Sequence, residues 1–287
     1  MGLFGLGKKQ KQEAVQGKLE ALLDGHEIPS FQAVTMRILR EVRDPETSTD
    51  RLAEVLQWDP GLVVRVLKTV NTASYSPAKP IQCVAHAASF MGRAALEQLV
   101  LAIAIKDAVP STPAPGFEPR TYWRAACFRA GLSRQLAARL HPAKQAECFT
   151  SGLLQDLAVP VLANARQSDY GPVLEHWHGE PSAHLDELER DALGWTHSDV
   201  GALLGHMWEL PENLVQSIQH HHSSTPSDSE LPPAVKLVSV LRESETQLAE
   251  EALIERARLD YGLESDWTLE TLRAAEDQSR ELADMLS

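Results

Sequence analysis

Apolar residues at three- and four-residue spacing, framed by helix-capping signals, are the pattern that most constrains the fold of this chain. Asp59 is placed as an N-cap, and Pro60 follows at the first helical position, where its missing N–H costs nothing. The apolar side chains that then recur on one helical face are Leu62, Val63, Val66, Leu67 and Val70. Alternating apolar and polar residues between hairpin turns, as in β-strands, do not occur. The sequence therefore predicts an all-α protein.

The helices on either side of this segment carry signals of their own. Ser48 is placed to cap the preceding helix, and Gly92 is placed to end a helix that begins near Ile81. The stripe that the preceding helix would present to its neighbour consists of Leu52, Val55 and Leu56. We therefore expect the two stripes to pack against each other.

A cluster of prolines divides the chain. Pro110, Pro113, Pro115 and Pro119 lie close together, which predicts a loop between two helical lobes. The predicted segments are a flexible tail (1–17), an N-terminal lobe (18–109), a loop (110–120), a second lobe (121–242) and a C-terminal helical extension (243–287). The extension contains two amphipathic helices, at 248–258 and 269–286, that either cap the domain or bind a partner.

The composition is that of a cytoplasmic protein with a sizeable core. Hydrophobic residues make up 43% of the 287, and no apolar run approaches the roughly 18 residues that span a bilayer. The N-terminus lacks the order of charge and apolar residues that a secretory signal needs. Cys83, Cys127 and Cys148 lie far apart and lack zinc-site spacing, so we expect buried, reduced thiols.

The charge argues against nucleic acid as a partner. A formal net charge of −13 opposes the phosphate backbone, whose binding depends on Lys and Arg. The two short helices within 52–70 nevertheless have the spacing of a helix-turn-helix, so a DNA-binding regulator remains a minor alternative.

Four blocks of sequence, taken in order, carry a family resemblance. They are Ile28–Val34 with Asp44-Pro45, Asp59–Tyr75 continuing through 81–104, Ser151–Leu162 with the pair Gln155-Asp156, and His197–His222. Over about Leu19–Leu241 the chain thereby resembles the HD-related output domain, or HDOD, family. The members of this family are non-catalytic relatives of the HD and HD-GYP metal-dependent phosphohydrolases, and the resemblance makes the second lobe HD-like.

The resemblance implies that the catalytic metal ligands of the HD enzymes are largely lost. Those enzymes hold metal through a histidine on an earlier helix, a His-Asp pair and a later aspartate. Here the earlier helix, at 122–140, has no histidine, and the pair begins with Gln155. The later aspartate aligns near Ser239, and the lysine that often follows the pair aligns with Val159. Only Asp156 is retained, so we expect no metal, no cofactor and no enzymatic activity.

The residues expected to line this vestigial pocket are Gln155, Asp156, His197 and His221. His197 shares a helical face with Gly201 and Leu204, which would aim its imidazole inward beside Asp156. The successive residues His220, His221 and His222 are each turned by about 100°, so at most one or two face the pocket. A solvated helix end is the favoured interpretation of this run. His184, His206 and Trp208 are assigned to packing or to the surface.

Two functions follow from the resemblance. The favoured one is a non-enzymatic module of bacterial signal transduction that binds a protein partner or a small regulatory ligand. The alternative is a residual metal-dependent phosphohydrolase, acting on a nucleotide or cyclic dinucleotide through Asp156, His197 and His221. The two differ in metal content, because under the favoured function excess Mn or Fe should not raise the melting temperature.

The candidate partner-binding residues lie on the helix after Asp59. They are Arg65, Lys68, Asn71 and Tyr75, which the apolar stripe does not require. Asn71 could instead only cap this helix, and Tyr75 could only pack.

Overall fold

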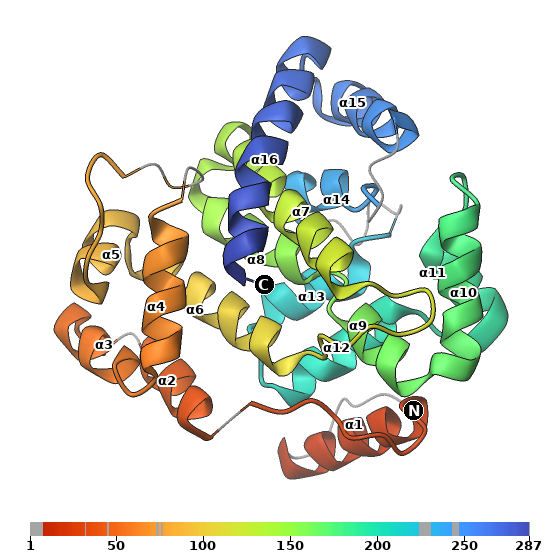
Figure 1. Ribbon diagram of the computed structural model, residues 1–287, viewed down its shortest axis with the longest axis horizontal. Coiled ribbons are helices and arrows are strands. Elements are labelled where there is room, and N and C mark those ends of the chain that lie inside the picture. The colour runs from red at the N-terminus through yellow and green to blue at the C-terminus, as the bar shows by residue number, and fades with distance from the viewer. Residues whose placement is uncertain are drawn as a thin grey trace. The chain divides into compact units, whose positions relative to one another are not determined.

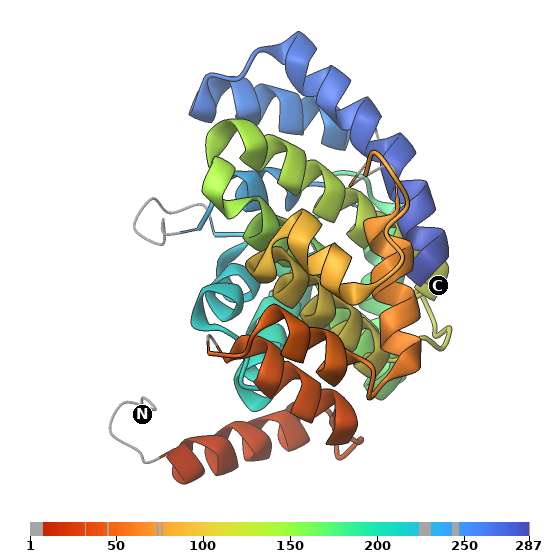
Figure 2. The ribbon, with the colours of Figure 1, turned by 90° about the vertical axis from the view of Figure 1, so that its left-hand side faces the viewer.

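The chain is helical in the part that the structure describes (Figures 1 and 2). The computed structural model describes residues 8–31, 33–44, 46–72, 75, 77–223, 231–242 and 247–286. Within these ranges no β-strand forms, and the extended pairing consists of one isolated bridge between Ala114 and Phe117. The predicted all-α class is confirmed.

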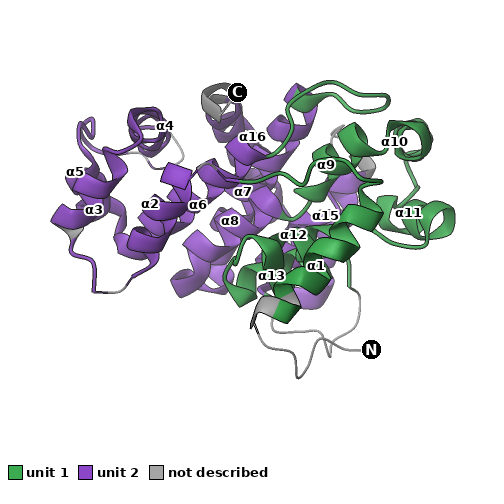
Figure 3. Ribbon diagram, turned by 90° about the horizontal axis from the view of Figure 1, so that it is seen from below, with its two compact units in different colours: residues 1–30, 109–119, 155–231 green, residues 31–108, 120–154, 232–287 purple. Residues whose placement is uncertain are grey.

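Two compact units make up the chain (Figure 3). Unit 1 contains residues 1–30, 109–119 and 155–231, and unit 2 contains residues 31–108, 120–154 and 232–287. The segment 109–119 is the proline-rich connection that the sequence predicted as a loop. The units cross the predicted lobe boundaries, because each is assembled from segments that are distant in the sequence.

Unit 1 holds the helices that surround the candidate site. They are α1 (Lys8–Leu22), α9 (Ala158–Ala165), α10 (Gln167–Gly179), α11 (Leu185–Leu193), α12 (His197–Met207) and α13 (Glu212–His220). The predicted flexible tail over 1–17 is wrong from Lys8 onward, where α1 forms. Val15, Leu19 and Leu23 are buried, and α1 contacts α12. Burial of these side chains supplies the stabilisation that a short isolated helix lacks.

Unit 2 holds the remaining helices. They are α2 (Ala33–Arg43), α3 (Thr49–Leu56), α4 (Pro60–Val70), α5 (Val84–Met91), α6 (Arg93–Ala108), α7 (Pro119–Leu140, from Arg120 on), the short 3₁₀-helix η1 (Pro142–Lys144), α8 (Gln145–Leu154), α14 (Pro233–Val238), α15 (Gln247–Tyr261) and α16 (Ser265–Leu286). The C-terminal pair α15 and α16 lie side by side (Figure 2). Their Leu253, Ala257, Leu272 and Ala275 join one buried cluster with α7 and α14, so this pair packs on the unit as a cap.

The predicted caps of α3 and α4 are confirmed, and so are their stripes except at Val63 and Leu67, which are partly exposed. The Ser48 side chain accepts a hydrogen bond from the backbone N–H of Arg51, and Asp59 Oδ1 accepts one from the N–H of Leu62 at 2.9 Å. Gly92, with φ of 84°, ends α5 in a conformation that favours glycine. The stripe residues that are buried are Leu52, Val55, Leu56, Leu62, Val66 and Val70. Local sequence signals therefore set these helix boundaries.

No single helix of the described ranges is long and apolar enough to cross a membrane. The helices α5 and α6 have the length and the apolar composition of a membrane span only when they are taken together. The chain bends by 119° at the break between them. Most of the apolar side chains of α6 are buried within unit 2.

The three cysteines differ in environment. Cys127 and Cys148 are buried, whereas Cys83 is exposed, so the expectation of three buried thiols is wrong for Cys83. Cys83 directly precedes α5, at its N-cap position. Burial raises the pKa of the Cys127 and Cys148 thiols to about 12, which keeps both protonated at neutral pH.

We expect a thiol-alkylating reagent to modify Cys83 in the folded protein and to leave Cys127 and Cys148 unmodified until the chain is denatured. The reason is that the reagent must reach the sulfur, and of the three thiols only that of Cys83 is exposed. Peptide mass spectrometry before and after denaturation measures the labelling. Modification of Cys127 in the folded protein at the rate of Cys83 would contradict the burial described here.

Candidate functional site

The candidate site is built around Asp156, in the turn that precedes α9. The Asp156 side chain is 16% exposed, and its Oδ1 lies 3.0 Å from His221 Nε2 and 3.4 Å from His197 Nε2. The preceding Gln155 is buried, and neither polar atom of its amide has a hydrogen-bond partner among the described residues. The carboxylate, and not the glutamine, therefore takes part in the cluster.

A capping box places His197 in the first turn of α12. The Thr196 hydroxyl accepts a hydrogen bond from the backbone N–H of Asp199, and Asp199 Oδ2 accepts one from the N–H of Thr196 at 3.0 Å. These bonds satisfy N–H groups that the start of a helix leaves without partners. His197 is 1% exposed, and Gly201 and Leu204 are buried on the same face, as the sequence predicted.

The buried carboxylate of Glu189, on α11, fixes the orientation of His197. Glu189 Oε2 accepts hydrogen bonds from the backbone N–H of His197 and from its Nδ1, each at 2.7 Å. Glu189 Oε1 accepts a third, at 2.6 Å, from the hydroxyl of Tyr170 on α10. Because Nδ1 donates to the carboxylate, the His197 Nε2 faces Asp156.

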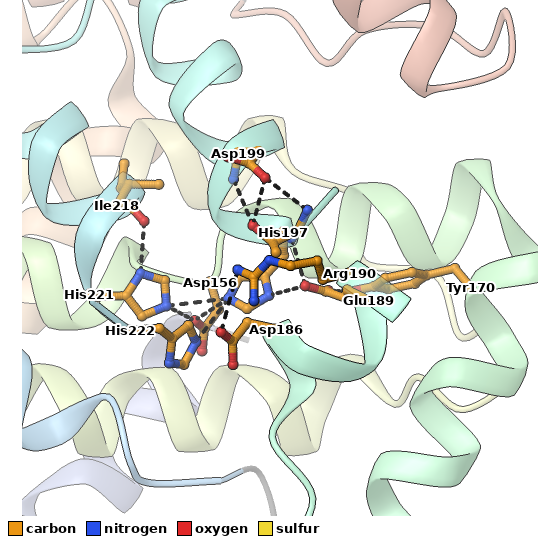
Figure 4. Close-up of polar contacts among 11 residues, drawn as sticks. Asp156, Tyr170, Asp186, Glu189, Arg190, His197, Asp199, Ile218, His221 and His222 are labelled. Carbon is orange, nitrogen blue, oxygen red and sulfur yellow. Dashed lines mark hydrogen bonds and ion pairs between the residues drawn. The ribbon is translucent and has the colours of Figure 1, made fainter. Parts of the chain in front are cut away.

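The end of α13 brings two further imidazoles to the cluster (Figure 4). His221 Nδ1 donates to the Ile218 carbonyl at 2.7 Å, so its Nε2 points toward Asp156. The Nε2 of His197 lies 3.3 Å from His221 Nε2 and 3.2 Å from His222 Nε2. His221 and His222, two of the three successive histidines, thus face the site, which agrees with the expectation that at most two can do so. A solvated helix end is the wrong description of His221, which is 1% exposed because α13 packs on α12.

Electrostatics distinguishes His197 from an ordinary histidine. Burial by itself would lower the pKa of His197, but the Glu189 and Asp156 carboxylates outweigh this effect and raise it to about 10. The two carboxylates therefore favour the protonated, positively charged form of His197.

A close approach of α12 to α13 supports this arrangement. A Cβ added to Gly201 would lie 2.7 Å from Ile218 Cγ2, which is closer than a Cβ atom comes to a non-bonded neighbour in real structures. The carbonyl of this same Ile218 accepts the hydrogen bond from His221. The glycine therefore allows the two helices to pack at the distance that brings His197 and His221 together.

We expect Gly201→Ala to destabilise the protein by about 1–3 kcal/mol, because the added methyl group overpacks a tight contact. The matched control is Gly179→Ala, near the end of α10, where an added Cβ meets nothing within 4 Å. Chemical denaturation of the two variants gives the comparison. Equal stability of the two variants would contradict the tight contact at Gly201.

Three of the four predicted pocket residues come together: Asp156, His197 and His221. The sequence interpretation missed His222, Glu189 and Tyr170. A signal for Glu189 exists, because Glu189 lies four residues after Leu185 on the buried face of α11, where a carboxylate needs partners. Trp208 packs as expected, with its indole donating to the Pro29 carbonyl at 2.8 Å, and His184 and His206 are exposed.

The predicted partner-binding residues, all in unit 2, differ in what they contact. Arg65 pairs with Asp107 at 2.7 Å. The Asn71 amide donates to the carbonyls of Leu67 and Ile81 and accepts from the N–H of Ile81, so it ties the end of α4 to the following segment. Tyr75 packs edge-on against Phe149 and beneath the guanidinium of Arg134. Lys68 is exposed. Structural roles thus account for Asn71 and Tyr75.

Comparison with known proteins gives the same family as the sequence blocks. The HDOD domain model matches residues 28–224. A protein of Treponema pallidum (strain Nichols), named "Uncharacterized protein", is 24% identical over 219 residues, which are 74% of this chain and 41% of that protein. The chain thus spans about two fifths of the length of this curated relative.

Two solved structures show the same fold over nearly the whole chain. An HDOD domain protein of unknown function from Geobacter sulfurreducens matches with a TM-score of 0.74 and 20% identity, covering 98% of this chain and 99% of that one. A Shewanella amazonensis protein named "Putative phosphohydrolase" matches with a TM-score of 0.75 and 22% identity, covering 96% and 98%. From the family match, which covers more than half of its residues, the chain belongs to the HDOD domain family.

Proposed function

We propose that this chain is a non-enzymatic module of bacterial signal transduction, which acts by binding a protein partner or a small regulatory ligand. The observation that carries the proposal is Gln155. In the HD enzymes this position supplies an imidazole to the metal, whereas here it carries a buried amide, a weak neutral donor. The helix α7 has no His, Asp or Glu, and neither has α14, so the sequence offers no replacement there.

Relatives give further support. A Marinobacter aquaeolei protein named "Putative signal transduction protein" has the same fold, with a TM-score of 0.68 and 20% identity. The fold is therefore compatible with a signalling role, and the lost ligand positions remove the known route to hydrolysis.

We expect no hydrolysis of bis-p-nitrophenyl phosphate, a nucleoside triphosphate or a cyclic dinucleotide, with Mn2+, Fe2+ or Zn2+ present, above the level of Asp156→Ala. The reason is that the HD pattern retains only its aspartate. Gln155→His should also be inactive, since one restored imidazole leaves the other positions unfilled. Turnover by the natural protein that Asp156→Ala abolishes would overturn the proposal, and turnover by Gln155→His alone would show that the other ligands had been misplaced.

The second candidate function, a residual metal-dependent phosphohydrolase, is favoured by the convergence of Asp156, His197 and His221. A catalytic site would keep one coordination position open for water, as three-ligand zinc enzymes do. His222 Nε2, 3.2 Å from that of His197, offers a fourth protein ligand beside these three. A fourth protein ligand there favours the non-enzymatic function.

For the protein partner, the exposed side of α4 is the surface that we propose. Lys68 is exposed, and Val64, one turn earlier, is 51% exposed. Phe90 on α5 is 43% exposed. Arg65 is a poor position to mutate, because a glutamate there would face Asp107.

The test of this surface is recovery of partners from native extract with Lys68→Glu and with the matched control Lys18→Glu, an exposed position on α1. We expect Lys68→Glu to lose partners that Lys18→Glu retains, with unchanged circular dichroism. Equal recovery would remove α4 from consideration as the partner surface.

A further inference from the structure

Four groups capable of binding a metal converge in unit 1. They are a carboxylate oxygen of Asp156 and one ring nitrogen each of His197, His221 and His222, and these atoms all lie within 4.8 Å of one another. Asp156 and His222 are partly exposed, while His197 and His221 are buried. The cluster is therefore mostly enclosed by the protein and reaches solvent through Asp156 and His222.

We propose that Asp156, His197, His221 and His222 together bind one divalent transition-metal ion of the zinc class, in a closed site with four protein ligands. The site makes no use of Gln155. It departs from the favoured sequence-based expectation of no metal, and it adds His222 to the Asp156, His197 and His221 of the alternative.

The distances within the cluster fit such an ion. A tetrahedral zinc ion about 2.0–2.1 Å from each nitrogen or oxygen ligand sets neighbouring ligand atoms about 3.3 Å apart. The distances from His197 Nε2 to the Nε2 atoms of His221 and His222 are 3.3 and 3.2 Å. Those from Asp156 Oδ1 to His197 Nε2 and His221 Nε2 are 3.4 and 3.0 Å. Four edges of the cluster thus have the length that tetrahedral coordination needs.

The orientation of the rings also points to a cation. His197 Nδ1 donates to Glu189 and His221 Nδ1 donates to the Ile218 carbonyl, each at 2.7 Å. Both rings thereby turn their Nε2 atoms toward each other and toward the Asp156 carboxylate. A divalent cation at this point would be coordinated by both nitrogens and by the carboxylate oxygen, in place of a proton on His197 Nε2. A partner on Nδ1 is also how proteins orient histidines that bind metal.

The chemistry of the donors selects the class of ion. Three imidazoles and one carboxylate suit Zn2+ and its transition-metal neighbours, whereas Mg2+ and Ca2+ prefer oxygen ligands. Four protein ligands are typical of structural zinc sites, because catalytic sites keep a position for water. The ion would thus link the turn before α9 to α12 and to the end of α13, as a brace within unit 1.

The first experiment measures metal directly. Untagged protein, purified without chelator, should contain about one equivalent of zinc by elemental analysis. After removal of metal by a chelator, added Co2+ should develop the visible absorption of tetrahedral cobalt, and Zn2+ should displace it. Absence of zinc together with failure to bind added Co2+ or Zn2+ would overturn the proposal.

Variants then test each ligand. His221→Ala, His222→Ala and Asp156→Asn should each weaken Co2+ binding by more than about 100-fold, and Glu189→Gln by about 10–100-fold, since it orients His197 without touching the ion. The controls are His220→Ala, in the same run of histidines, and His206→Ala, an exposed position of α12. Both should bind Co2+ as the natural protein does. If His222→Ala binds like the controls, the closed four-ligand site is wrong.

Failure of this inference is distinguishable from failure of the proposed function. Metal binding without hydrolysis supports both, and absence of metal with no hydrolysis removes only the metal site. Metal-dependent turnover would remove the non-enzymatic function, and it would also contradict the closed four-ligand site, because a closed site leaves no place for an activated water. Circular dichroism of every variant separates a lost ligand from a lost fold.

Discussion

Replacing Glu189 with leucine is expected to destabilise the folded protein by about 3–5 kcal/mol, since it removes one partner of a buried charged pair. Glu189 is fully buried and accepts hydrogen bonds from His197 and Tyr170. Leucine would leave the imidazole Nδ1, the His197 backbone N–H and the tyrosine hydroxyl without their acceptor. Chemical denaturation, followed by circular dichroism, measures the loss.

Graded variants identify the cause of that loss. Tyr170→Phe removes one hydrogen bond to a charged group and should cost about 1.5–3 kcal/mol. The matched control is Glu187→Leu, an exposed position of the same helix, which should change stability by less than about 0.5 kcal/mol. If Glu189→Leu were as stable as Glu187→Leu, the buried network would contribute nothing to folding.

Zinc is expected to stabilise the metal-free protein by about 2.7 kcal/mol when its free concentration is a hundred times the dissociation constant. The ion binds three segments of unit 1 that separate on unfolding, so it favours the folded state. The expected result is a melting temperature several degrees higher with Zn2+ than after chelation. Thermal melting with and without a chelator gives the comparison.

This shift should disappear in His221→Ala and persist in His220→Ala, which differ only in which neighbouring imidazole is lost. A protein whose melting temperature does not respond to Zn2+, Mn2+ or Fe2+ would instead confirm the expectation drawn from the sequence alone. A shift that both variants retain would place the ion elsewhere in the molecule.

The sequence by itself determined the secondary structure around α3, α4 and α5. Asp59, Ser48 and Gly92 set helix ends through bonds within a few residues, and periodic apolar residues set the buried faces. Such signals are local, so no knowledge of distant segments is needed. The ordered blocks likewise gave the family, which the HDOD match confirms. His197 was placed correctly because its face was fixed by Gly201 and Leu204.

Only the tertiary structure decided that His222, Glu189 and Tyr170 belong to the site. Asp156, His197 and His221 are far apart in the sequence, and His222 joins them because α13 packs closely against α12. Helical periodicity gives the angle between successive histidines, but not the direction in which the run points, which depends on the packing of the whole helix. The same reason explains α1, predicted as a tail, since its apolar side chains are buried in a unit built from distant segments. Local sequence signals thus determined where the helices begin and end, and long-range packing completed the set of side chains at the site.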